Sequence, residues 1–262
     1  MNFGDLNLSD IYYSANKFRN YKNVIIHYNG NFKNMFEHTL ADVLTNCIIK
    51  FYEEKIIEKL INFNYFYFES FEKSKIKKIC INLLNSENIN ESYFRKDTLW
   101  LCVYNYIKEH KAMILQGFVN FRISGYTKQL DYLTDISVND FIIEKEYNEF
   151  IDLLRLYINS KSASNKQIHL IYREKKALLL DQNKNTISDS DEIFNTKFLS
   201  DISFSDNDYI LNTLLNILPQ KINIHLLTVS DDFIKTLQLI FEDKINICTD
   251  CNICKTYKFI EQ

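Results

Sequence analysis

The sequence predicts an α+β protein in which long helices form a central bundle packed on a small mixed β-sheet. Three observations support this fold class. Apolar residues recur at helical spacing through most of residues 34–159. After residue 166 the apolar period changes to that of strands, in 168–181 and again in 222–248. The chain also opens with two short segments of strand character.

The opening segments are residues 6–14 and 22–28, and Asn29 with Gly30 supplies a turn signal directly after the second. We assign residues 1–30 to these amino-terminal strands. Two isolated strands are only marginally stable. We therefore expect the pair to join the carboxy-terminal sheet, which would make the chain one compact domain; two compact domains are the alternative.

The helical region spans residues 31–160. Its first helix is predicted over 34–63, with room for one break, and the last carries Ile143, Tyr147 and Phe150 on one stripe. The other apolar periods place further helices at 70–84, 91–110, 113–136 and 140–159.

The carboxy-terminal region, residues 167–254, combines a β-hairpin with a strand-helix-strand unit. A polar segment at 161–166 is the candidate linker before it. The predicted elements are a hairpin of 168–172 and 177–181, a helix from Asp206 to about Leu218 that Pro219 ends, a strand at 222–229, a helix at 230–241 and a strand at 245–248. The last two strands should be parallel, joined by a right-handed crossover.

Composition excludes several common functions. An apolar share of 46% and a charged share of 25% are typical of a folded globular protein, and a net charge of -3 gives no overall attraction to nucleic acid. With four glycines, at residues 4, 30, 117 and 125, neither a P-loop nor a dinucleotide fingerprint fits anywhere in the chain. The nucleophile elbow of hydrolases is also absent.

The sequence predicts a cytoplasmic protein that does not enter a membrane. No segment approaches about 18 consecutive apolar residues, and the first ten residues carry acids where a signal peptide needs cations. Six cysteines are too few for a disulfide scaffold. Cys47, Cys80 and Cys102 lie in apolar helical surroundings and are interpreted as buried thiols.

A metal site is predicted at the triplet Cys248, Cys251 and Cys254. Cysteines separated by two residues can direct their sulfurs at one ion, with zinc the first candidate. A structural site needs a fourth ligand, and His225 on the preceding parallel strand is the nearest choice. Iron-sulfur ligation, thiol redox chemistry and ordinary structural thiols remain alternatives. The histidines at 27, 38, 110 and 169 are expected to stand alone.

Arg122 is the second candidate site. Phe118, Arg122 and Tyr126 fall on one face of the helix predicted there, and an arginine among apolar neighbours requires a carboxylate partner. We expect Glu144 or Glu146 to supply it, as a buried structural ion pair. A partner or anion site centred on Arg122 is the alternative.

A third candidate is the lysine-rich segment at residues 73–78, which has Phe and Tyr nearby. Such a face is an ordinary solvated helix surface or, alternatively, a nucleic-acid-binding surface. The solvated surface is the preferred interpretation, and we expect no nucleic-acid partner.

Five blocks of the sequence resemble the YtxC-like family of sporulation proteins from spore-forming Firmicutes. They are GFVNFRISGYTKQLDYL, DFIIEKEYNEFIDLLRLYI, QIHLIYREKKALLLD, DNDYILNTLLNILPQKINIH and CTDCNIC, within residues 115–254. The resemblance implies a role in endospore formation and no particular reaction. Our first hypothesis is a non-enzymatic cytoplasmic sporulation protein that binds another protein, its cysteines stabilising the fold through a metal. A thiol-dependent enzyme or redox or metal sensor, and a nucleic-acid-binding protein, are the alternatives, and the oligomeric state is open.

Overall fold

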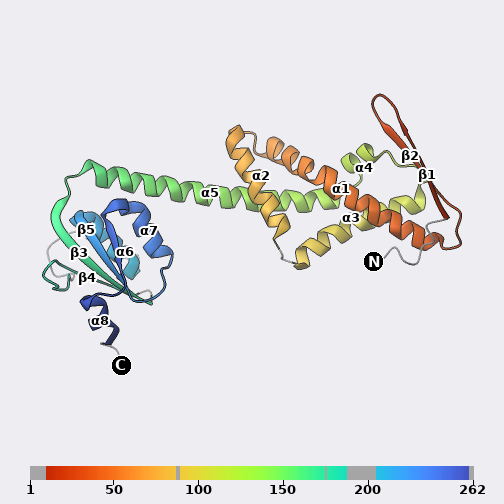
Figure 1. Cartoon of the computed structure of the whole chain (residues 1–262). Helices are drawn as coiled ribbons and strands as arrows, with labels where there is room; N and C mark the ends of the chain where they lie inside the picture. Colours follow the sequence, from red (N-terminus) through yellow and green to blue (C-terminus); the bar gives the residue numbers. More distant parts are fainter. Residues whose placement is uncertain (1–9, 87–88, 175, 188–204, 260–262) are drawn as a thin grey trace. The chain divides into compact units, whose positions relative to one another are not determined.

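The structure is a computed structural model that describes residues 10–86, 89–174, 176–187 and 205–259. The chain divides into two compact units, Met1–Ile143 and Glu144–Gln262. The fold is α+β, as predicted, and each unit contains its own sheet (Figure 1).

The amino-terminal strands form a separate two-stranded sheet and do not join the carboxy-terminal one, so that expectation is wrong. Strand β1 (Ile11–Lys17) pairs antiparallel with β2 (Lys22–Tyr28). The physical reason is local, because the backbone N–H of Phe18 donates to the carbonyl of Tyr21 at 2.8 Å and closes a short turn. The first part of the predicted strand at 6–14 lies outside the described residues.

The base of this hairpin is fixed by Tyr28. Its ring stacks on Phe36 with centroids 4.7 Å apart, and its hydroxyl accepts the backbone N–H of Phe32 at 3.0 Å. The ring lies against Gly30, where a Cβ atom would come within 2.4 Å of the Tyr28 hydroxyl. A side chain at this position would therefore displace the Tyr28 ring.

Five helices follow. Their bounds are α1 Lys33–Asn64, α2 Ser70–Asn85, α3 Ile89–Glu109, α4 Leu115–Phe121 and α5 Ser124–Ser160. The first three agree with the sequence prediction. The break predicted near residue 138 is instead at Arg122 and Ile123, because α4 ends there, while residues 136–140 contain no glycine or proline that would stop α5.

A buried polar group lies inside the apolar core of the first unit. The hydroxyl of Tyr126 donates to Glu53, and the Nε of Arg95 lies 3.8 Å from Glu53 Oε2, which is near enough for an ion pair but too far for a hydrogen bond. These residues come from α5, α1 and α3. The apolar side chains around them include Ile48, Ile57, Ile76, Leu99, Val103 and Leu130. The three helices therefore share one charged contact within their common core.

The second unit is built on a four-stranded sheet of order β4-β3-β5-β6. The strands are β3 Ser164–Arg173, β4 Lys176–Leu180, β5 Pro219–Leu226 and β6 Ile245–Cys248. Strand β3 pairs antiparallel with β4 and parallel with β5, and β5 pairs parallel with β6. The predicted hairpin and parallel pair are therefore confirmed.

Three helices accompany this sheet, namely α6 Asp206–Ile217, α7 Asp232–Phe241 and α8 Asn252–Phe259, with a 3₁₀ turn at Glu242–Lys244. Helix α6 is capped by Ser205, whose side chain accepts the N–H of Asp208, and not by Asp206. Helix α8 was not predicted. The chain divides at Ile143 and Glu144 within α5, while the polar segment at 161–166 leads directly into β3.

The two faces of the second sheet differ. Alternate residues of β3 and β5 pack into an apolar core with α6, α7 and the last part of α5. On the strands these core residues are Ile168, Leu170, Tyr172, Ile222 and Ile224. The intervening residues of β3 and β5 point to the opposite face, where polar groups gather. No described helix is long and apolar enough to cross a membrane.

Candidate metal centre

His225 lies on β5 one residue after Ile224, so its side chain points away from the apolar core. It is buried nonetheless, with 3% of its surface exposed. Cys248, the last residue of β6, is its register partner on the neighbouring strand. The parallel pairing thus places both side chains on one face of the sheet.

The other two cysteines come from the turn after β6. Cys251 immediately precedes α8, and Cys254 lies in its first turn. The backbone N–H of Cys254 is directed at the Cys251 sulfur at 3.5 Å, and the Cys254 thiol donates to the carbonyl of Cys248 at 3.6 Å. The two-residue spacings therefore form a tight reversal that turns the sulfurs inward.

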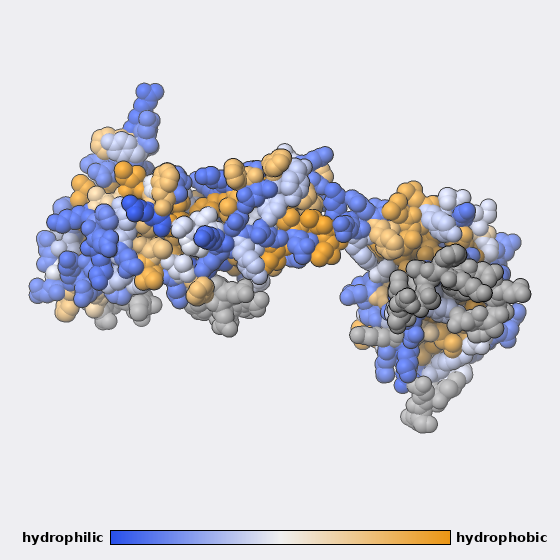
Figure 2. All heavy atoms as spheres, turned by 180° about the vertical axis from the view of Figure 1, so that it is seen from behind, coloured by the Kyte–Doolittle hydropathy of each residue, from blue (hydrophilic) through white to orange (hydrophobic). Residues whose placement is uncertain are grey.

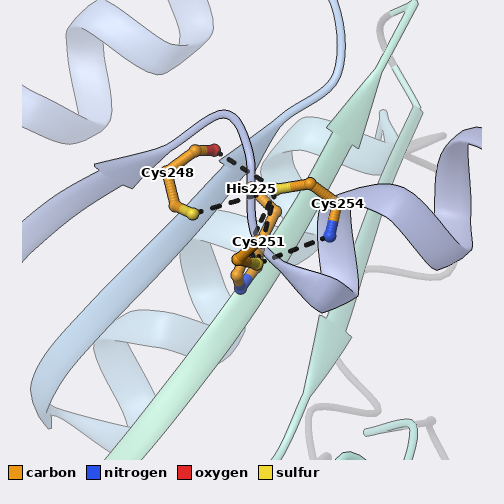
Figure 3. A group of neighbouring side chains, drawn as sticks. All are labelled: His225, Cys248, Cys251 and Cys254. Carbon is orange, nitrogen blue, oxygen red and sulfur yellow. Dashed lines mark hydrogen bonds between the residues drawn. The ribbon is translucent and has the colours of Figure 1, made fainter.

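The four side chains converge, as Figure 3 shows. His225 Nδ1 lies 3.4 Å from the sulfurs of both Cys251 and Cys254. The Cys254 sulfur lies 3.6 Å from that of Cys251 and 3.9 Å from that of Cys248. All four ligand atoms lie within 4.8 Å of one another. The structure thus brings together the four residues predicted as ligands.

These spacings match a tetrahedral metal site. Zinc binds sulfur at about 2.3 Å and imidazole nitrogen at about 2.0–2.1 Å, which sets tetrahedral ligands about 3.8 Å apart for two sulfurs and about 3.6 Å apart for nitrogen and sulfur. The observed separations of 3.4–3.9 Å are close to both values. The donor set fits one ion at the centre of the cluster.

The thiols differ in how readily they ionise. At Cys251 burial opposes ionisation, but hydrogen bonds from the backbone N–H groups of Cys254 and Ile253 and with the neighbouring thiols together lower its pKa. Burial raises the pKa of Cys254 to about 11, with the charge and hydrogen bonds of its neighbours adding to the rise. The thiols of Cys251 and Cys254 therefore differ in the direction of their pKa shifts.

His169 also belongs to this site, although the sequence suggested that it stands alone. Its Nδ1 lies 2.8 Å from His225 Nε2, and the two rings stack with centroids 5.1 Å apart. Because Nδ1 of His225 faces the sulfurs, its Nε2 is the atom left to hydrogen bond with His169. Burial lowers the pKa of both imidazoles, which favours their neutral forms.

The residues of the second predicted site belong to both units. Arg122 caps the carboxyl end of α4 and is exposed, as are Glu144 and Glu146. Arg122 lies in the first unit and both glutamates lie in the second, so the ion pair between them stays a prediction. The prediction assumed a continuous helix through residues 118–126, but the helix ends at Arg122 and its side chain turns to solvent. Arg95 and Glu53 form a buried ion pair within the first unit.

The lysine segment forms ion pairs, and the remaining cysteines are buried or half-buried. Lys77 forms ion pairs with Glu54 at 2.8 Å and with Glu58 at 2.9 Å, which neutralise the charge at the centre of residues 73–78.

Cys80 is buried, as predicted, while Cys47 and Cys102 are half-buried and free. Burial raises the thiol pKa of Cys80 and Cys102.

Fold and site together define an α+β protein whose carboxy-terminal sheet carries a cluster of one histidine and three cysteines. The comparison with protein families matches residues 38–246 to the model described as the YtxC-like family. The chain belongs to the YtxC-like family. The matched region contains His169 and His225 and ends two residues before Cys248.

A relative in Bacillus subtilis (strain 168) is named "Uncharacterized protein YtxC". The two sequences are 20% identical over 213 residues, which cover 79% of this chain and 75% of the relative. No solved structure matches the chain. These relations support the predicted family and add no reaction.

Proposed function

We propose that the carboxy-terminal unit binds one zinc ion through His225, Cys248, Cys251 and Cys254, and that this ion holds the last helix against the sheet. The observation that carries the proposal is the convergence of four ligand atoms within 4.8 Å of one another, four of whose separations are 3.4–3.9 Å, from a strand pair, a turn and the start of α8. Bound zinc would supply four coordinate bonds and neutralise thiolate charge.

The ligand set supports a structural ion rather than a catalytic one. Four protein ligands complete a tetrahedral zinc site, whereas a catalytic zinc keeps a position open for water or substrate. An iron-sulfur cluster normally takes four cysteines and needs more room than ligand atoms within 4.8 Å of one another provide. The site thus favours a stabilising role over chemistry at the metal.

The function that follows is that of a non-enzymatic protein whose zinc-stabilised unit supports binding to another protein. Within the described ranges, this cluster is the one place where three or more metal-binding side chains converge. Free cysteines throughout the chain are consistent with a reducing, cytoplasmic setting. Family membership motivates a role in sporulation, which a spore-yield assay on a deletion strain tests.

The decisive experiment is elemental analysis of protein purified without chelator. We expect about one zinc ion per chain, since one set of four ligands holds one ion. The triple variant C248S/C251S/C254S should lose the metal, while the matched control C47S/C102S, which removes two cysteines of the helical unit, should retain it.

Two results would argue against the proposal. One is native protein without metal whose melting temperature does not change when zinc is added. The other is a thiol at Cys251 that reacts with an alkylating agent far faster than a free cysteine in zinc-treated protein, which would favour the thiol-dependent enzyme instead.

A further inference from the structure

The β1–β2 hairpin stands apart from the helices of its unit. Every strand residue except Ile11 and Tyr28 is exposed, on both faces of the ribbon. Among the described elements, β1 and β2 pair extensively only with each other. Figure 1 shows the ribbon extending away from the helices, and Figure 2 shows its hydrophilic end from behind. A two-stranded ribbon of this kind gains little stability from its own contacts.

The charge of the hairpin has one sign. Lys17, Arg19 and Lys22 surround its turn, and residues 11–28 contain no aspartate or glutamate. The protein as a whole carries a net charge of -3, so this cationic end is a local exception. Three cations on a projecting turn complement a polyanion.

Aromatic side chains alternate with these cations in the turn sequence KFRNYK. The rings of Phe18 and Tyr21 stack with centroids 4.6 Å apart and an interplanar angle of 19°. They remain 47% and 62% exposed, so the outer face of each ring is available to a ligand. Tyr12 and Tyr13 add two exposed rings further along β1.

From this juxtaposition we propose that the β1–β2 hairpin binds single-stranded nucleic acid, with Phe18 and Tyr21 stacking on bases and Lys17, Arg19 and Lys22 contacting phosphates. Cations interleaved with exposed aromatic rings are the chemistry that single strands require, because unpaired bases offer flat faces and the backbone offers charge. This site is separate from the zinc cluster and does not depend on it.

Other polyanions fit the hairpin less well. A duplex buries its base faces in the helical stack, so the aromatic pair would gain nothing from it beyond the phosphate contacts. A lipid bilayer would have to accept the unpaired backbone groups of the ribbon edges together with three cations at the leading turn, at high energetic cost. Both are distinguishable in one binding assay.

The assay is fluorescence anisotropy with the full-length, zinc-supplemented protein and four probes. These are a labelled thymidine oligonucleotide, the uridine RNA of equal length, a DNA duplex of equal length and vesicles containing phosphatidylserine. We expect affinity for one or both single strands above that for the duplex and vesicles. Three phosphate contacts predict a slope of log affinity against log salt of about -2.

Two hairpin variants test the two parts of the site. F18A/Y21A should weaken single-strand binding by roughly tenfold or more while keeping the salt slope. K17Q/R19Q/K22Q should reduce the slope toward zero while keeping the rings. The matched control is F71A/K75Q, which removes another exposed ring with its lysine 5.9 Å away, in α2 of the same unit, and should bind as the parent does.

Four outcomes would overturn the proposal. They are no measurable binding to either single strand, equal or tighter binding to the duplex, binding to vesicles alone, and single-strand binding that F71A/K75Q weakens while F18A/Y21A leaves it intact. Circular dichroism of each variant confirms that the helices remain folded, so a lost affinity reports the removed side chains.

Discussion

The contact with His169 limits which ring nitrogen of His225 is available to a metal. His225 Nε2 lies 2.8 Å from His169 Nδ1, and with Nδ1 of His225 bound to a metal its proton would be on Nε2 and would be donated to His169. His169 must then accept, which places its own proton on Nε2. Such a hydrogen bond fixes ring orientation and increases the basicity of the ligating nitrogen.

We predict that H169A binds zinc about 10- to 100-fold more weakly than the parent, because His225 loses the group that orients it. Competition with a chromophoric chelator measures the affinity. The control variant H110A removes an exposed histidine that stacks on Tyr106 in the other unit. It should leave the zinc affinity unchanged. Equal affinities for H169A and the parent would contradict the role.

The sequence predicted the four side chains that converge, but not the contact of His169 with them. The spacing of the cysteine triplet is a local signal, and the strand-helix-strand pattern was enough to bring His225 beside it. Placing His169 there requires the register of β3 against β5, in which His169 pairs with Asn223 and lies diagonal to His225. Alternation along one strand does not give that register.

At the scale of elements, the Glu53 carboxylate connects three helices. It accepts the Tyr126 hydroxyl and faces the Arg95 guanidinium within the apolar core. Burial and the Glu53 charge raise the pKa of Tyr126, so this hydroxyl remains a donor throughout the physiological range. Removing the carboxylate leaves a buried cation and a buried donor without a partner.

We expect E53A to lower the free energy of unfolding of the helical unit by about 3–5 kcal/mol. The neighbouring variant E54Q removes an exposed ion pair with Lys77 and should have no measurable effect. Urea unfolding followed by circular dichroism compares them. Equal midpoints for E53A and E54Q would show that the buried group contributes nothing to stability.

The sequence predicted helices better than their ends and connections. Long apolar periods gave α1, α2 and α3 almost to the residue, since each spans several turns. Helix α8 was missed because its eight residues hold too few apolar positions to show a period. The end of α4 was missed for a related reason, because a helix of seven residues is too short to show a period of its own.

At the scale of the molecule, the two units have separate apolar cores. Such cores can lose stability independently, and a ligand that binds one native unit stabilises that unit. The boundary within α5 was not predictable, because a helix can continue through it without any change in period or composition.

Removing zinc with a chelator should therefore destabilise the carboxy-terminal unit alone. Free zinc at 100 times its dissociation constant adds about 2.7 kcal/mol to the free energy of unfolding of this unit, and chelation would remove that contribution. Hydrogen exchange followed by mass spectrometry should show faster exchange in β5, β6 and α8 and unchanged exchange in α1 to α3. Uniform acceleration across both units would contradict independent cores.

We expect the parallel pairing of β3 with β5 to form late in folding. His169 and His225 lie 56 residues apart in the chain, whereas the three cysteines fall within a single turn and the start of a helix. Long-range parallel pairs form slowly, because a large loop must close before its contacts can compensate. Because the four proposed ligands lie within residues 225–254, zinc capture after dilution from denaturant would time the pairing of β5 with β6, and the rise to full affinity would time the later pairing of β3, which carries His169.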